Sequence, residues 1–66
     1  MKSFKPSRVK FLRLKRGLTQ QSLAESIGLS ASGVAQVEKG KRQPLASTIA
    51  ALAEALKTTP NYFFAE

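Results

Sequence analysis

The side chains that carry most enzyme chemistry are absent from this sequence. It contains no histidine, no cysteine and no aspartate, and its 4 acidic residues are the glutamates Glu25, Glu38, Glu54 and Glu66. Acid–base catalysis near neutral pH, nucleophilic triads and thiolate or imidazole metal sites are built from the missing residue types. We therefore expect a protein that is not an enzyme and that holds neither a metal nor a cofactor.

The residues that remain available for function are cations, and they are clustered. The 66-residue chain has 11 Lys and Arg against 4 acidic residues, which makes a formal net charge of +7. Most of the cations lie before residue 17, and three more lie together at Lys39, Lys41 and Arg42. Such a small basic chain is typical of modules that bind an acidic partner, nucleic acid above all.

Short helices separated by glycine and proline must position these cations. Apolar residues recur at helical spacing (Val9 and Leu12, then Phe11 and Leu14) and show no sustained alternation of the strand type. The pattern predicts five short helices, over residues 8–16, 20–26, 31–38, 46–56 and 60–64. We expect one compact all-α domain over residues 1–66, with a basic arm at residues 1–6.

The second and third predicted helices form a recognisable unit. They are joined by Ile27, Gly28, Leu29 and Ser30, and a short glycine-containing turn between two helices is typical of a helix-turn-helix. In that motif one helix crosses the phosphate backbone, and the next helix lies in the major groove of DNA.

The residues in and around this unit resemble a known family. The matched positions are Leu14, Gly17, Leu18, Thr19, Gln20, Leu23, Ala24, Ile27, Gly28, Leu29, Ser30, Val34, Val37, Glu38, Gly40, Lys41, Arg42 and Pro44. In this order and spacing they resemble the Cro/C1-type (XRE) helix-turn-helix family, which includes phage repressors and restriction-modification controller proteins. The likeness continues through Ile49, Leu52 and Leu56 to Phe63 and Phe64, so it covers nearly the whole chain.

The resemblance implies a five-helix, lambda-repressor-like domain that binds double-stranded DNA. Proteins of this kind regulate transcription, usually as repressors, and act as homodimers on a roughly palindromic operator. By position, the resemblance implies base reading by Ala31, Ser32 and Gln36, and DNA backbone contacts by Gln20, Ser30, Lys39, Lys41 and Arg42. It also implies a structural salt bridge between Arg13 and Glu38, and a dimer interface at Tyr62, Phe63 and Phe64.

Some positions qualify these expectations. Lys57 stands where family members often have glycine, so we expect a strained left-handed residue or a different helix exit there. Gly33 lies inside the predicted recognition helix and costs about 1 kcal/mol of helix propensity relative to alanine.

Neither Arg nor Lys is among the base-reading residues, so we expect modest direct readout, with phosphate contacts and DNA shape supplying much of the selectivity. Adjacent side chains on a helix point about 100° apart, so one ring among Tyr62, Phe63 and Phe64 should fill the core.

The residues also leave other functions open. An antitoxin-type module that binds a protein partner and the DNA-binding domain of a longer regulator both suit the motif. An RNA-binding protein fits less well, because the aromatic residues lie apart from the basic clusters. A membrane-active helix fits least, because Gly and Pro divide the chain. The sequence shows no signal peptide and no apolar run of about 18 residues, so we expect a cytoplasmic protein without membrane association. The family resemblance implies a bacterial or phage origin.

Overall fold

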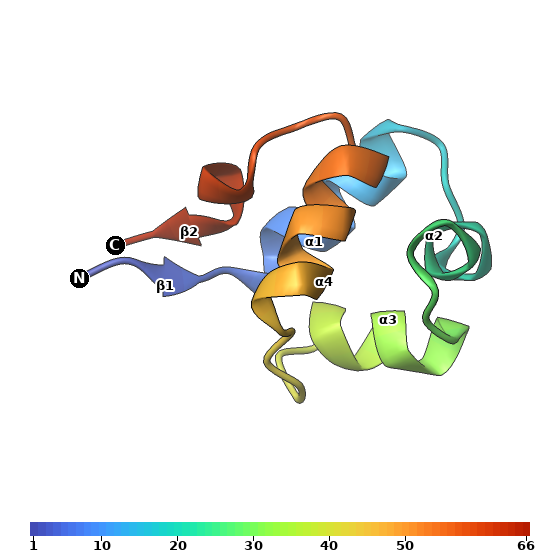
Figure 1. The fold of residues 1–66 in the computed structure, drawn as a ribbon, viewed down its shortest axis with the longest axis horizontal. Helices are drawn as coiled ribbons and strands as arrows, with labels where there is room; N and C mark the ends of the chain where they lie inside the picture. The colour runs from blue at the N-terminus through green and yellow to red at the C-terminus, as the bar shows by residue number, and fades with distance from the viewer.

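The computed structural model describes all 66 residues as four α-helices, a short 3₁₀ helix and a two-stranded sheet (Figure 1). In chain order the elements are β1 (Ser3–Phe4), α1 (Pro6–Lys15), α2 (Gln20–Ile27), α3 (Ala31–Glu38), α4 (Ala46–Ala55), the 3₁₀ helix η1 (Pro60–Phe63) and β2 (Phe64–Ala65). The four α-helices match their predicted ranges to within two residues at each end. The predicted count of five helices is wrong, because the last segment forms only a 3₁₀ turn that leads into a strand.

Hydroxyl side chains fix the starts of α2 and α3. The Thr19 Oγ1 accepts a hydrogen bond from the Ser22 backbone N–H at 2.9 Å, and the Ser22 Oγ accepts one from the Thr19 N–H at 3.0 Å, which together form a capping box. The Ser30 Oγ accepts from the Gly33 N–H at 3.0 Å. Gly28, between the two helices, has φ 74°, a left-handed conformation that glycine adopts without steric cost. These local contacts determine the residue at which each helix begins.

One apolar core joins the helices. Its members are Val9, Leu12, Leu23, Ala24, Val34, Val37, Ile49, Leu52, Ala53, Leu56 and Phe63. α2 packs against α3 and α4, and α1 packs against α3 and η1. Phe63 is 0% exposed and is the largest fully buried side chain. No helix has both the length and the apolar content that crossing a membrane requires.

The two ends of the chain are tied together by a small antiparallel sheet, which the all-α prediction missed. Phe4 pairs with Phe64 and Ser3 pairs with Ala65, and the Lys5 N–H donates to the Phe63 carbonyl at 2.7 Å. Figure 1 shows both termini on the same side of the molecule. The segment predicted as a basic arm is therefore held to the domain at its strand residues.

Candidate nucleic-acid interface

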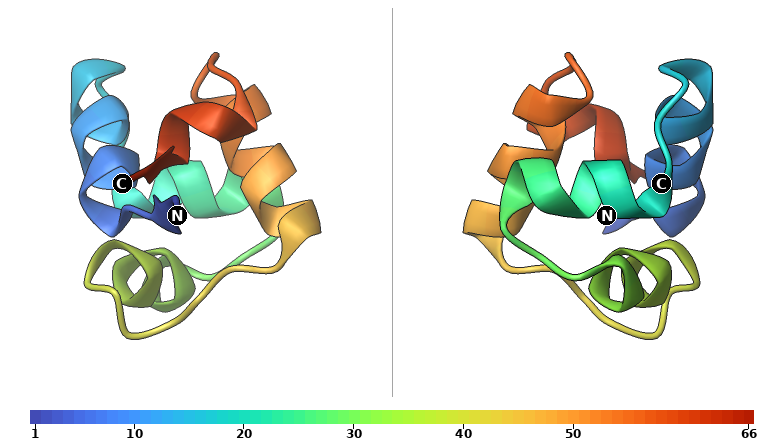
Figure 2. Two further views of the ribbon diagram at one scale, coloured as in Figure 1. Left: turned by 90° about the vertical axis from the view of Figure 1, so that its left-hand side faces the viewer. Right: turned by 90° about the vertical axis from the view of Figure 1, so that its right-hand side faces the viewer.

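α3 lies along one edge of the molecule and leaves one long side free. Figures 1 and 2 show it at the lower edge, with α2 above it and the loop to α4 leaving from its C-terminal end. Val34 and Val37 are 1% and 2% exposed and hold its inner side. Ser32 and Gln36 are exposed, and Ala31 at the first position is half-buried. Because residues four apart share a helix face, Ser32 and Gln36 form one outward polar surface.

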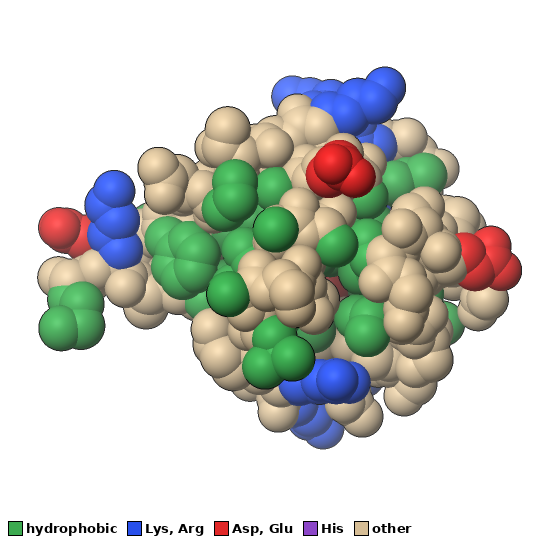
Figure 3. Space-filling model, viewed as in Figure 1, with side chains coloured by type: hydrophobic (Ala, Val, Ile, Leu, Met, Phe, Trp, Pro, Cys, Tyr) green, Lys and Arg blue, Asp and Glu red, His purple; other side chains and the backbone are tan.

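Three exposed cations follow α3 directly. Lys39, Lys41 and Arg42 carry no carboxylate partner, because the one salt bridge of the structure joins Arg13 to Glu38. Figure 3 shows Lys and Arg side chains at the lower edge, where Figure 1 places the loop between α3 and α4. The carboxylates visible in the same view lie away from that edge. The free side of α3 is thus bordered by positive charge, which attracts an anionic partner.

A buried ion pair holds the C-terminal end of α3. The Arg13 Nε donates to the Glu38 Oε2 at 2.6 Å, and the Arg13 Nη2 donates to the Glu38 Oε1 at 3.2 Å. The side chains of Arg13 and Glu38 are only 8% and 3% exposed. The Arg13 Nη1 also donates to the Leu18 carbonyl at 2.9 Å. This bidentate geometry fixes α3 against α1.

The same carboxylate connects α3 to the start of α2. The Gln20 Nε2 donates to the Glu38 Oε1 at 3.1 Å. The Ser30 hydroxyl oxygen caps α3, so its O–H hydrogen is left to donate outward. Gln20 and Ser30, two of the residues predicted to contact the DNA backbone, therefore each make an internal hydrogen bond and keep a further N–H or O–H donor for a ligand.

The aromatic residues at the C-terminal end do not form one exposed cluster. Phe63 is 0% exposed and belongs to the core, so its predicted place in a dimer interface is wrong. Tyr62 and Phe64 are half-buried. The Arg8 Nη1 donates to the Tyr62 carbonyl at 2.8 Å, and its guanidinium lies 5.1 Å from the centre of the Tyr62 ring. Phe64 meets Phe4 edge to face, with ring centroids 5.9 Å apart. Only Tyr62 and Phe64 are left partly accessible.

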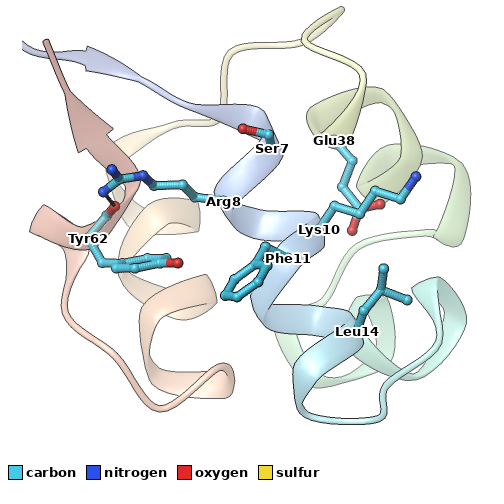
Figure 4. A pocket seen from close by; sticks show the side chains of 7 residues that line it. All are labelled: Ser7, Arg8, Lys10, Phe11, Leu14, Glu38 and Tyr62. Atoms are coloured by element: carbon cyan, nitrogen blue, oxygen red, sulfur yellow. Dashed lines mark hydrogen bonds between the residues drawn. The ribbon is translucent and has the colours of Figure 1, made fainter.

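The structure also shows a groove on α1 that the sequence reasoning missed. In Figure 4, Arg8, Phe11 and Tyr62 lie at one end of this groove and Lys10 and Leu14 toward the other. Phe11 and Leu14 are 56% and 58% exposed, although their spacing matches that of the buried Val9 and Leu12. Two stripes of the same period run along this short helix, and the period alone does not say which of them faces the core.

Comparisons with known proteins agree with this geometry. A helix-turn-helix family model matches residues 9–63. The HTH-type transcriptional repressor RghR of Bacillus subtilis is 47% identical over 58 residues, which are 86% of this chain and 42% of that repressor. The chain thus spans about two-fifths of the length of this relative.

Two solved structures share the fold. The P22 c2 repressor, in complex with a synthetic operator, has a TM-score of 0.87 at 26% identity, with 92% of each chain covered. The restriction-modification controller protein C.AhdI of Aeromonas hydrophila has a TM-score of 0.85 at 39% identity, with 89% of each chain covered. The family model covers most of the chain, and the likeness to these proteins extends over the same helices. The chain therefore belongs to this helix-turn-helix family, the Cro/C1-type (XRE) group of DNA-binding transcriptional regulators.

Proposed function

We propose that this chain binds double-stranded DNA sequence-specifically and represses transcription, with α3 in the major groove. The observation that carries the proposal is the free polar side of α3, followed at its C-terminal end by three unpaired cations. Glu38 holds this helix at a fixed angle to α1 and α2 through its bonds to Arg13 and Gln20. A rigidly held helix with a polar face and a basic border matches the shape and charge of the major groove.

The contacts divide into two kinds. Gln36 can pair with adenine N6 and N7, Ser32 can bond either donor or acceptor groups, and the Ala31 methyl can meet a thymine methyl. Lys39 and Lys41 supply charge for phosphates, Arg42 adds a third cation beside α3, and Gln20 and Ser30 offer neutral donors to the backbone at the starts of α2 and α3. The cations supply most of the affinity, and the side chains that face the groove select the sequence.

We infer further that two copies bind a roughly palindromic operator, with recognition helices about 34 Å apart in adjacent major grooves. The apolar residues that we assign to self-association are the half-buried Tyr62 and Phe64, together with Leu45, which is 73% exposed at the start of α4. Sedimentation equilibrium of Phe64→Ser and Leu45→Ser tests the interface, with Phe11→Ser as a control that changes an exposed apolar residue elsewhere. Weaker dimerisation in either of the first two variants supports the dimer. A wild-type chain that stays monomeric on its operator contradicts it.

The decisive experiment is selection of binding sites from random duplex DNA, followed by affinity measurements at several salt concentrations. We expect a site with two inverted half-sites. If each subunit neutralises roughly five phosphates, log K should fall against log salt with a slope of about −0.9 per phosphate contacted. A slope near zero, or a pool that stays random after selection, overturns the proposal.

A further inference from the structure

Gly33 is buried inside α3 although it carries no side chain. Glycine in a helix interior costs about 1 kcal/mol relative to alanine, and Gly33 does not have the left-handed φ of Gly17, Gly28 and Gly40. The position therefore does not need glycine for its backbone conformation. The missing side chain instead leaves room for a neighbouring side chain to lie against this flank of the helix.

The neighbour is the side chain of Arg42. A Cβ at Gly33 would lie 3.4 Å from the Arg42 Nη1, 3.4 Å from the Ser30 Oγ and 3.8 Å from the Leu29 Cβ. Arg42 comes from the loop beyond the other end of α3, so its side chain runs back along the flank of the helix to its first turn. Its guanidinium takes no part in the salt bridge, and the side-chain hydrogen bonds donated by arginine come from Arg8, Arg13 and Arg16 instead. All five of its N–H donors are therefore free for a ligand.

We propose that Arg42, lying over Gly33 at the first turn of α3, reads a guanine in the major groove and is a specificity-determining residue. This inference rests on the proposed function. The N-terminal residues of a recognition helix are those that approach base edges, and the Arg42 guanidinium lies beside that turn. A planar guanidinium donates two parallel N–H bonds to guanine O6 and N7. Arg42 thus supplies the guanidinium contact to guanine that is missing from Ala31, Ser32 and Gln36.

The test compares base preference with overall affinity. The wild-type chain should select a G at one position of each half-site. Replacing that G·C pair, or substituting 7-deazaguanine for the G to remove its N7 acceptor, should weaken wild-type binding roughly 5- to 150-fold. Arg42→Ala should bind the original and altered duplexes equally. Lys41→Ala is the matched control from the same loop, and it should weaken all duplexes by one factor and keep the guanine preference.

A second variant tests the role of Gly33. Gly33→Val would crowd the Arg42 guanidinium without lowering helix propensity, so it should lose guanine preference while its thermal melt stays cooperative. A Gly33→Val chain that folds and keeps the full preference would show that the contact with Arg42 does not matter for reading. If Arg42→Ala weakens every duplex equally and keeps the preference, Arg42 is a phosphate contact and the inference is wrong while the proposed function stands. A wild-type chain that binds no duplex overturns both.

Discussion

At the scale of single residues, Glu38 joins three helices through one buried carboxylate. Its carboxylate accepts three N–H bonds, two from Arg13 and one from Gln20. It is the last residue of α3, so these bonds join α3 to α1 and to the start of α2. The pair is buried, and removing one partner of a buried pair leaves an uncompensated charge in a dry site.

We expect Arg13→Ala to lower the free energy of unfolding by about 3–5 kcal/mol, because it leaves the Glu38 carboxylate buried with only Gln20 as a donor. Urea denaturation followed by circular dichroism measures the loss. Lys15→Ala, at an exposed position of the same helix, is the control and should change stability by less than about 0.5 kcal/mol. Equal stabilities of the two variants would show that the ion pair contributes nothing.

Gly33→Ala should stabilise the domain by roughly 0.4–1 kcal/mol, because alanine restricts the unfolded chain and the helical backbone accepts it. The added Cβ would lie 3.4 Å from its nearest neighbours, an ordinary contact distance. Gly28→Ala is the matched comparison. Gly28 has φ 74°, so alanine there should cost about 1–2 kcal/mol. A thermal melt that ranks the two variants in the opposite order would contradict both assignments.

At the scale of elements, the exit from α4 is the one strained turn. Lys57 has φ 58° and is the only non-glycine residue with positive φ, so of the two outcomes expected at this usual glycine position the structure has the strained left-handed residue. The Arg16 Nε donates to the Leu56 carbonyl at 3.0 Å, and the Thr58 N–H donates to the Ala53 carbonyl at 2.8 Å. These bonds satisfy carbonyls at the helix end and hold Lys57 in the left-handed conformation.

Lys57→Gly should therefore raise the free energy of unfolding by about 0.5–1 kcal/mol. The left-handed conformation costs a side-chain residue about 1–2 kcal/mol, and the greater entropy of unfolded glycine offsets part of the gain. Lys57→Ala keeps the Cβ and removes the charge, so it separates strain from electrostatics and should give no gain. Equal stabilisation by both variants, measured in urea, would point to charge as the cause.

At the scale of the whole molecule, stability depends on closing the chain ends onto the core. The ring of Phe4 lies 6.3 Å from the ring of Phe63 and 5.9 Å from that of Phe64, centroid to centroid. A domain of about 60 residues buries only about 60% of the surface that its unfolded chain exposes. One additional half-buried ring is therefore a large share of its margin.

Phe4→Ala should cost about 1–2 kcal/mol, which is part of the 3–5 kcal/mol typical of a fully buried phenylalanine. Phe11→Ala is the matched control, because Phe11 is 56% exposed on α1, and it should leave stability within about 0.5 kcal/mol. Differential scanning calorimetry compares the two variants. A Phe11 loss as large as the Phe4 loss would place Phe11 in the core.

Sequence alone determined the features that depend on neighbours a few residues away. Thr19 and Ser30 cap helices, Gly28 turns the chain, and apolar spacing marks α2, α3 and α4, because caps, φ preference and helical period all act within one or two turns. The helix-turn-helix unit and the family resemblance follow from these local patterns.

Tertiary structure decided which of several equivalent residues meets a partner from a distant part of the chain. It buried Phe63 while leaving Tyr62 and Phe64 at the surface, and it turned Phe11 to solvent. It also brought Arg42 back over Gly33. Strands of two residues are too short to show a period in the sequence, so the small sheet could not be predicted. The contacts of an aromatic ring or a guanidinium depend on how whole helices pack, so a local sequence pattern does not predict them either. The sequence already placed Lys39, Lys41 and Arg42 directly after α3, and the packing decided that the Arg42 guanidinium lies beside the first turn of that helix.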